Sequence, residues 1–187
     1  MNTLIAIDPG ASGGIAVWRD GQPADAMPMP PTEGDVLNLL RQLAVDPANT
    51  VAVVEEVGGY VGKAQPGSSA FKFGRNFGFL LGVLQTLGVR VELVRPQKWQ
   101  KALGLGNASG CSSKSEWKNK LKGCAQRLHP HLKPTLATAD ALLILEHAVA
   151  GTTRSVMEAA ASPGRSTPLS CPSTQVRDGR TRYPHDP

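Results

Sequence analysis

Two short apolar runs separated by a turn constrain the fold more than any other part of this chain. The runs "LIAI" and "GIAVW" flank the segment "DPGASG", in which Gly, Pro and Ser favour a reversal of the chain. They predict an antiparallel hairpin of residues 4–7 and 14–18, with residues 24–29 as a candidate third strand. Asp8 is left at the end of the first strand, as a turn residue, as one edge of a glycine loop that grips phosphate, or as a metal ligand.

The next elements alternate between helix and strand. In "DVLNLLRQLA" the apolar residues recur at helical spacing, with Asp35 as the expected N-cap. "TVAVVEEV" is a continuous apolar run, typical of a strand buried on both faces. A glycine-rich loop, a helix from residue 70 to 88, the strand "VRVELV" and helices at 97–103, 113–128 and 138–150 follow. With right-handed connections, this order predicts an α/β fold with a mixed five-stranded sheet, three antiparallel strands followed by two parallel ones, flanked by helices: the ribonuclease H-like architecture.

The length of the chain and the change in its composition near the C-terminal end predict one folded domain and a tail. The 187 residues, 41% of them hydrophobic, suffice for one globular domain. From about Ala159 onward the sequence is rich in Pro, Ser, Thr and Arg and almost free of aliphatic residues, so it cannot bury enough apolar surface to offset its ordering entropy. We therefore expect a domain over residues 1–150 and a disordered tail over residues 151–187. The arginines of the tail are either without a role or available for phosphate contact.

Charge and cysteine content narrow the class of protein. The formal net charge of +5 is compatible with a polyanionic partner. The three cysteines form no CxxC pair, which argues against a zinc ribbon or a disulfide framework and favours a reducing compartment. No apolar stretch approaches the roughly 18 residues of a membrane span, and the first apolar run lacks the basic start of a signal peptide. A cytoplasmic location is expected.

Three carboxylates are placed where they can act together. Asp8 ends the first strand, Glu55 ends the buried strand expected beside it, and Asp140 lies in the first turn of a largely apolar helix. Taken alone, Asp140 is explained by the favourable interaction of an acid with the N-terminal end of the helix dipole. Two acids that emerge side by side repel each other, which is tolerable only if a cation lies between them or one of them stays protonated. Mg²⁺ and Mn²⁺ prefer carboxylate oxygens, and a pair of such ions would activate water and stabilise the leaving oxygen of a phosphodiester.

Five blocks of sequence carry a specific resemblance. In order, they are "IDPGASGGIAV", "VVEEV", "SSAFKFGRNFGFLLGVLQTLGVRVELVRPQKWQKALGL", "SKSEWKNKLKGCAQRLHP" and "TADALLILEHA". Over about residues 3–150 the chain resembles the RuvC-like crossover-junction endonucleases, most of all their phage-type branch. The resemblance implies a homodimer that cuts four-way (Holliday) or branched DNA. It also implies that the cleavage uses two metal ions, Mg²⁺ or Mn²⁺. It implies that Asp8, Glu55 and Asp140 are catalytic metal ligands, and that Lys114 contacts the scissile strand or stabilises transition-state charge.

Two positions depart from the family pattern, Ala137 and Gln100. Cellular relatives often carry Asp or His three residues before the last acid, where this chain has Ala137. Water, a DNA phosphate, Glu56 or His147 would then complete the cation shell, although Glu56 should point to the opposite sheet face and His147 lies two turns beyond Asp140. Ala137, together with Gln100 where relatives often have a lysine after the tryptophan, keeps open a second hypothesis, a non-catalytic protein that binds branched DNA. A third, a nucleotide binder of the actin and hexokinase type, is disfavoured because the chain lacks room for a second domain.

Aromatic and basic residues predict where DNA would lie. Tyr60 follows Glu55 in the glycine-rich loop and is a candidate for stacking at a branch point. Lys98 and Lys101 flank a Trp-Gln pair where relatives often have a lysine directly after the tryptophan, and Lys114 and Lys118 lie on a lysine-rich helix. The four phenylalanines between residues 71 and 79 favour packing in the core or in a dimer interface.

Overall fold

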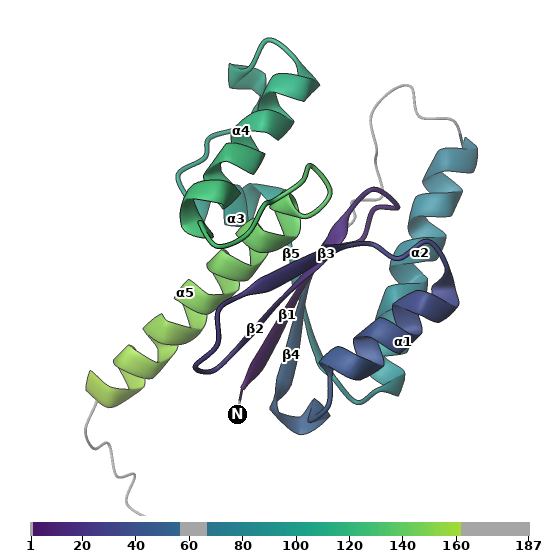
Figure 1. Ribbon diagram of the computed structural model, residues 1–187, viewed down its shortest axis with the longest axis vertical. Helices are drawn as coiled ribbons and strands as arrows, with labels where there is room; N and C mark the ends of the chain where they lie inside the picture. The colour runs from purple at the N-terminus through teal and green to yellow at the C-terminus, as the bar shows by residue number, and fades with distance from the viewer. Residues whose placement is uncertain (1, 57–66, 162–187) are drawn as a thin grey trace, which may run out of the picture.

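The computed structural model describes residues 2–56 and 67–161, with residues 152–161 described by their backbone alone. Its centre is one five-stranded sheet in the order β3-β2-β1-β4-β5. The strands are β1 (Thr3–Asp8), β2 (Gly14–Arg19), β3 (Asp25–Pro28), β4 (Thr50–Glu55) and β5 (Arg90–Val94). The first three are antiparallel, and β4 and β5 run parallel to β1 (Figure 1). The predicted mixed sheet is confirmed.

Helices cover both faces of the sheet (Figure 1). On one face lie α1 (Glu33–Leu43) and α2 (Gly67–Thr86), and on the other lie α3 (Pro96–Ala102), α4 (Lys114–Leu128) and α5 (Ala139–Ala161). Alternation along the strands divides the core into two layers. Ile5 and Ile7 of β1 pack with the first helical layer, whereas Leu4 and Ala6 pack with the second.

The start of α1 differs from the sequence-based expectation. Asp35 was predicted as the N-cap, but the cap is Thr32, and the helix begins at Glu33. The Thr32 hydroxyl accepts a hydrogen bond from the backbone N–H of Asp35 at 3.1 Å and donates to the Asp35 carboxylate at 2.6 Å. The hydroxyl thus satisfies a backbone N–H of the first turn, as an N-cap side chain does, and Asp35 belongs to that first turn.

The last helix is longer than predicted. It continues past the expected end at Ala150 as far as Ala161, and residues 162–187 of the predicted tail lie outside the described part. Its start is held by two threonines: the Thr135 N–H donates to the Thr138 hydroxyl at 2.9 Å, and the Thr138 N–H donates to the Thr135 hydroxyl at 3.2 Å. Within the described residues, no helix combines the length and the apolar character needed to cross a membrane.

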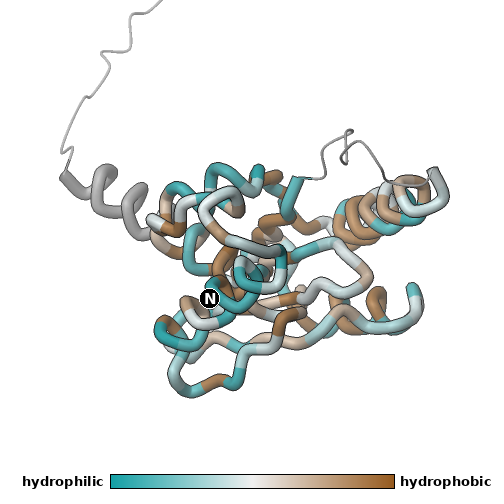
Figure 2. Tube along the Cα trace, turned by 90° about the horizontal axis from the view of Figure 1, so that it is seen from above, coloured by the Kyte–Doolittle hydropathy of each residue, from teal (hydrophilic) through white to brown (hydrophobic). Residues whose placement is uncertain are grey.

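The phenylalanines of α2 have different surroundings. Phe77 and Phe79 pack against the first core layer, while Phe71 is 72% exposed. Hydrophobic residues follow α2 along its length (Figure 2). Core packing therefore explains the second half of this helix, whereas most side chains of its first half are exposed.

Candidate active site

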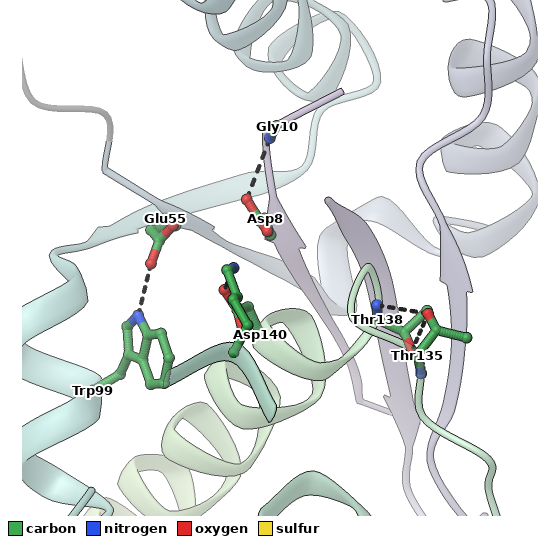
Figure 3. Close-up of polar contacts among 8 residues, drawn as sticks. Asp8, Gly10, Glu55, Trp99, Thr135, Thr138 and Asp140 are labelled. Atoms are coloured by element: carbon green, nitrogen blue, oxygen red, sulfur yellow. Dashed lines mark hydrogen bonds and ion pairs between the residues drawn. The ribbon is translucent and has the colours of Figure 1, made fainter. Parts of the chain in front are cut away.

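Strand register and alternation bring two of the acids to one edge of the sheet. β1 and β4 are adjacent and parallel, with Ile7 opposite Val54, so Asp8 and Glu55 follow at the same end. Val53 packs in the core layer beneath α5. Since side chains alternate between faces, Glu55 and Asp8 face α5 as well. Asp140, buried in the first turn of α5, completes the group (Figure 3).

Two glycines allow the N-terminal hairpin and α5 to meet. A Cβ atom on Gly14 would lie 2.7 Å from the carbonyl oxygen of Ala137 and 3.2 Å from Cα of Thr138, directly before α5. A Cβ atom on Gly13 would lie 2.3 Å from the backbone oxygen of Asp8. Real Cβ atoms do not approach so closely, so the turn requires glycine at both positions.

The turn also orients Asp8. The backbone N–H of Gly10 donates a hydrogen bond to Oδ1 of Asp8 at 3.2 Å (Figure 3). Asp8 is therefore a turn residue and a site residue at once. The glycines shape the hairpin around its carboxylate.

Burial and mutual repulsion oppose ionisation of the acids. Burial, and then the charge of Asp140, raise the pKa of Asp8. Burial, and then the charge of Asp8, raise the pKa of Glu55 to about 7. Such shifts are typical of carboxylates gathered at a functional site, and a cation placed among them would relieve the repulsion.

Lys118 supplies one positive charge to this group. Its Nζ lies 2.5 Å from Oδ2 of Asp140, and both side chains are largely removed from solvent. Burial alone would lower the pKa of Lys118, but the hydrogen bond to Asp140 and the charges of all three acids raise it. The ammonium group therefore stays protonated beside the acids. Lys118 was predicted as a DNA contact, and its part in this group was missed.

Lys114 lies elsewhere. It is the exposed first residue of α4, one turn before Lys118. Both lysines lie on the same stripe of the helix, and the sequence pattern did not distinguish them. The structure brings Lys118, rather than Lys114, to the carboxylates.

Trp99 makes a second contact that sequence reasoning missed. Its indole Nε1–H donates to Oε1 of Glu55 at 2.9 Å, and its side chain is fully buried (Figure 3). In the sequence, Trp99 was noted only as a marker for the flanking lysines. The available signal was the single polar atom of a large apolar side chain, which needs a partner when it is buried.

The other predicted residues lie around this centre or away from it. Lys98 and Lys101 are exposed on α3, and Tyr60 lies outside the described residues. Glu56 pairs with Nε of Arg95 at 3.0 Å. His147 lines a cavity of about 930 Å³ that borders the starts of β1, β4 and β5, so it does not extend the acidic group.

The donor set suits a hard divalent cation. Among residues 2–56 and 67–151, no three His, Cys, Asp or Glu side chains are arranged to hold a metal ion as they stand. However, no described residue forms a hydrogen bond with the buried Oδ1 of Asp140, and carboxylate oxygens are the ligands that Mg²⁺ and Mn²⁺ prefer. Asp8, Glu55 and Asp140 are the residues that would hold such an ion.

The sheet order and its helical layers define a ribonuclease H-like fold. The solved structures that are similar to this chain include two of RuvC. One is Thermus thermophilus RuvC, with a TM-score of 0.52 and 18% identity over 82% of this chain and 96% of the other. The second is T. thermophilus RuvC in complex with a Holliday junction substrate, with a TM-score of 0.56 and 18% identity over 83% and 97% of the two chains. The likeness confirms the predicted fold. No protein-family model and no curated protein sequence matches the chain.

Proposed function

We propose that this protein is a metal-dependent endonuclease that cuts branched DNA and resolves four-way junctions, as a phage-type relative of RuvC. The observation that carries the proposal is the meeting of Asp8, Glu55 and Asp140 on one face of the sheet, where burial and neighbouring acids raise the pKa values of Asp8 and Glu55. The similar structure of RuvC with a Holliday junction supports the choice of substrate. The activity would belong to the cytoplasm of a bacterial or phage-infected cell.

Different residues of the chain would hold the metal ions, balance charge on the phosphate and bind DNA. Asp8, Glu55 and Asp140 would hold one or two Mg²⁺ or Mn²⁺ ions, which when bound supply an activated water and stabilise the leaving oxygen. Lys118 keeps a positive charge beside Asp140, where it can balance charge that develops on the phosphate. Lys98, Lys101 and Lys114 are exposed on helices of the same layer and would bind flanking phosphates, with Tyr60 stacking at the branch and a second copy of the chain completing a homodimer.

Cleavage of labelled four-way junctions tests the proposal. Wild type should nick the junction with Mg²⁺ or Mn²⁺ and leave it intact with chelator, and Asp8→Asn or Asp140→Asn should lower the rate at least about a hundredfold, since each removes a ligand charge. Glu92→Gln is the matched control, because Glu92 is an exposed acid on β5. Paired symmetric nicks would indicate a dimer. Junctions left uncut with both metals would contradict the proposal.

One observation favours a second function. Lys118 already neutralises Asp140, and Ala137 offers no side-chain ligand where relatives often have one. A protein of this fold that binds branched DNA without cutting it would show salt-sensitive junction binding and no metal-dependent nicks. The same assay separates the two functions.

A further inference from the structure

We propose that Trp99 is a positioning residue, whose indole N–H holds one oxygen of Glu55 so that the other oxygen is presented to the cation shared with Asp8 and Asp140. The inference rests on the proposed metal-dependent function. It adds a residue outside the acidic group, and a contact that does not itself touch metal or DNA.

The backbone fixes the position of Trp99 relative to Glu55. β5 lies beside β4 with Val94 opposite Glu55, and the Glu56 N–H donates to the carbonyl of Val94 at 2.8 Å. Directly after β5, α3 begins with Pro96 at its first turn, where the fixed φ of proline favours helix initiation. Trp99 therefore lies about one helical turn beyond β5, and β5 is hydrogen-bonded to β4, the strand that carries Glu55.

The chemistry of the contact is directional. An indole nitrogen is a hydrogen-bond donor only. In the contact of 2.9 Å, Oε1 of Glu55 must therefore be the acceptor. This hydrogen bond favours the ionised carboxylate, against the effects of burial and of Asp8. A glutamate side chain that is free to rotate would lose conformational entropy on binding a cation, whereas an anchored one has lost it already.

Packing by itself does not explain the contact. Trp99 fills the core between the sheet and α5 with its ring, and a phenylalanine could fill much of that space. Trp117 is the matched comparison, since it is 7% exposed in the same core layer and its ring lies near the ammonium of Lys120. A purely structural role for Trp99 predicts that the two tryptophans respond alike to replacement by phenylalanine.

Mn²⁺ binding, followed by the electron paramagnetic resonance of the free ion, tests the role without any cleavage. We expect Trp99→Phe to raise the Kd for Mn²⁺ about tenfold, the scale on which partners of metal ligands act, and Trp117→Phe to leave it within about twofold. In a Glu55→Gln background, Trp99→Phe should have no further effect, because the group that it positions is changed. A Mn²⁺ affinity of Trp99→Phe equal to that of wild type would overturn the inference.

A second replacement covers the case in which Trp99→Phe fails to fold. In a Trp18→Phe, Trp117→Phe background, position 99 is filled with 3-benzothienylalanine, which keeps the ring shape and carries sulfur in place of N–H. A roughly tenfold loss of Mn²⁺ affinity supports the inference, and an unchanged affinity overturns it. If wild type binds no Mn²⁺, the inference and the proposed metal dependence both fail. If wild type binds Mn²⁺ but leaves junctions uncut, only the proposed function fails.

Discussion

Glu55 is the acid whose ionisation is most strongly opposed by its surroundings. Burial and the charges of Asp8 and Asp140 outweigh the help of Trp99 and Lys118, and its pKa rises to about 7. In the unfolded chain the same group titrates near 4.5. Because the folded state holds this proton more tightly, stability falls as the pH rises from about 4.5 to about 7 and then stays low.

Replacement of Glu55 by glutamine should therefore stabilise the protein in the absence of divalent cations. We expect Glu55→Gln to raise the free energy of unfolding at pH 8 by about 1–3 kcal/mol and to change it little at pH 4.5, since at low pH the native carboxyl is protonated too. Urea unfolding at both pH values measures the difference. Glu92→Gln is the control, and equal stabilities of Glu55→Gln and wild type at pH 8 would show that burial and the neighbouring acids do not oppose ionisation of Glu55.

The close contact at Gly14 leads to a prediction about packing. Gly14→Ala places a methyl group 2.7 Å from the carbonyl oxygen of Ala137 and 2.9 Å from that of Met27, and should cost about 1–3 kcal/mol through overpacking. Gly78→Ala is the control, because nothing lies within 4 Å of its added Cβ on α2 and helix propensity should then add about 0.5–1 kcal/mol of stability. Thermal unfolding compares the two, and similar melting temperatures would contradict the tight contact.

Between helices, the pair of Lys118 and Asp140 joins α4 to α5. Its side chains are 32% and 9% exposed, so loss of one partner leaves a poorly solvated charge. We expect Lys118→Met to lower the free energy of unfolding by about 1–3 kcal/mol at neutral pH, and Lys118→Met combined with Asp140→Asn to recover part of this loss. Chemical denaturation of wild type, the two single variants and the double variant gives the coupling free energy of the pair. Additive effects would mean that the pair contributes nothing to the docking of α4.

Much of the fold was predictable because the strands carry simple patterns. The hairpin follows from two apolar runs and a turn, and the strand from Thr50 to Glu55 follows from an uninterrupted apolar run. Boundaries were harder. The N-cap of α1 was assigned to Asp35 instead of Thr32, because both are good capping residues and only the hydrogen bonds distinguish them.

The site was predictable in its acids and not in its partners. Strand ends on adjacent strands meet by topology alone, which is why Asp8 and Glu55 could be paired from sequence. The contacts of Lys118 and Trp99 depend on how α3 and α4 rotate against α5. Core packing between distant segments decides this rotation. The sequence periodicity of a single helix therefore does not predict it.

For the folded chain as a unit, the exposed lysines of α3 lead to a prediction about DNA binding. Each phosphate contact contributes about 0.9 to the slope of log K against log salt on duplex DNA. We expect Lys101→Ala to weaken binding to a four-way junction and to reduce the salt slope by about one, measured by fluorescence anisotropy with chelator present. Arg41→Ala should change neither, because Arg41 lies at the end of α1 on the opposite face of the sheet. An unchanged slope for Lys101→Ala would remove α3 from the DNA-binding surface.

The meeting of the first strand with the last helix has a consequence for biosynthesis. The face of β1 that carries Leu4, Ala6 and Asp8 is covered by α5, whose first turn holds Asp140. While the ribosome is still making the chain, that face has no cover and the third carboxylate does not exist. The acidic group is therefore assembled only once α5 has been synthesised, and a chain released before then keeps Asp8 and Glu55 without the centre that they form together with α5.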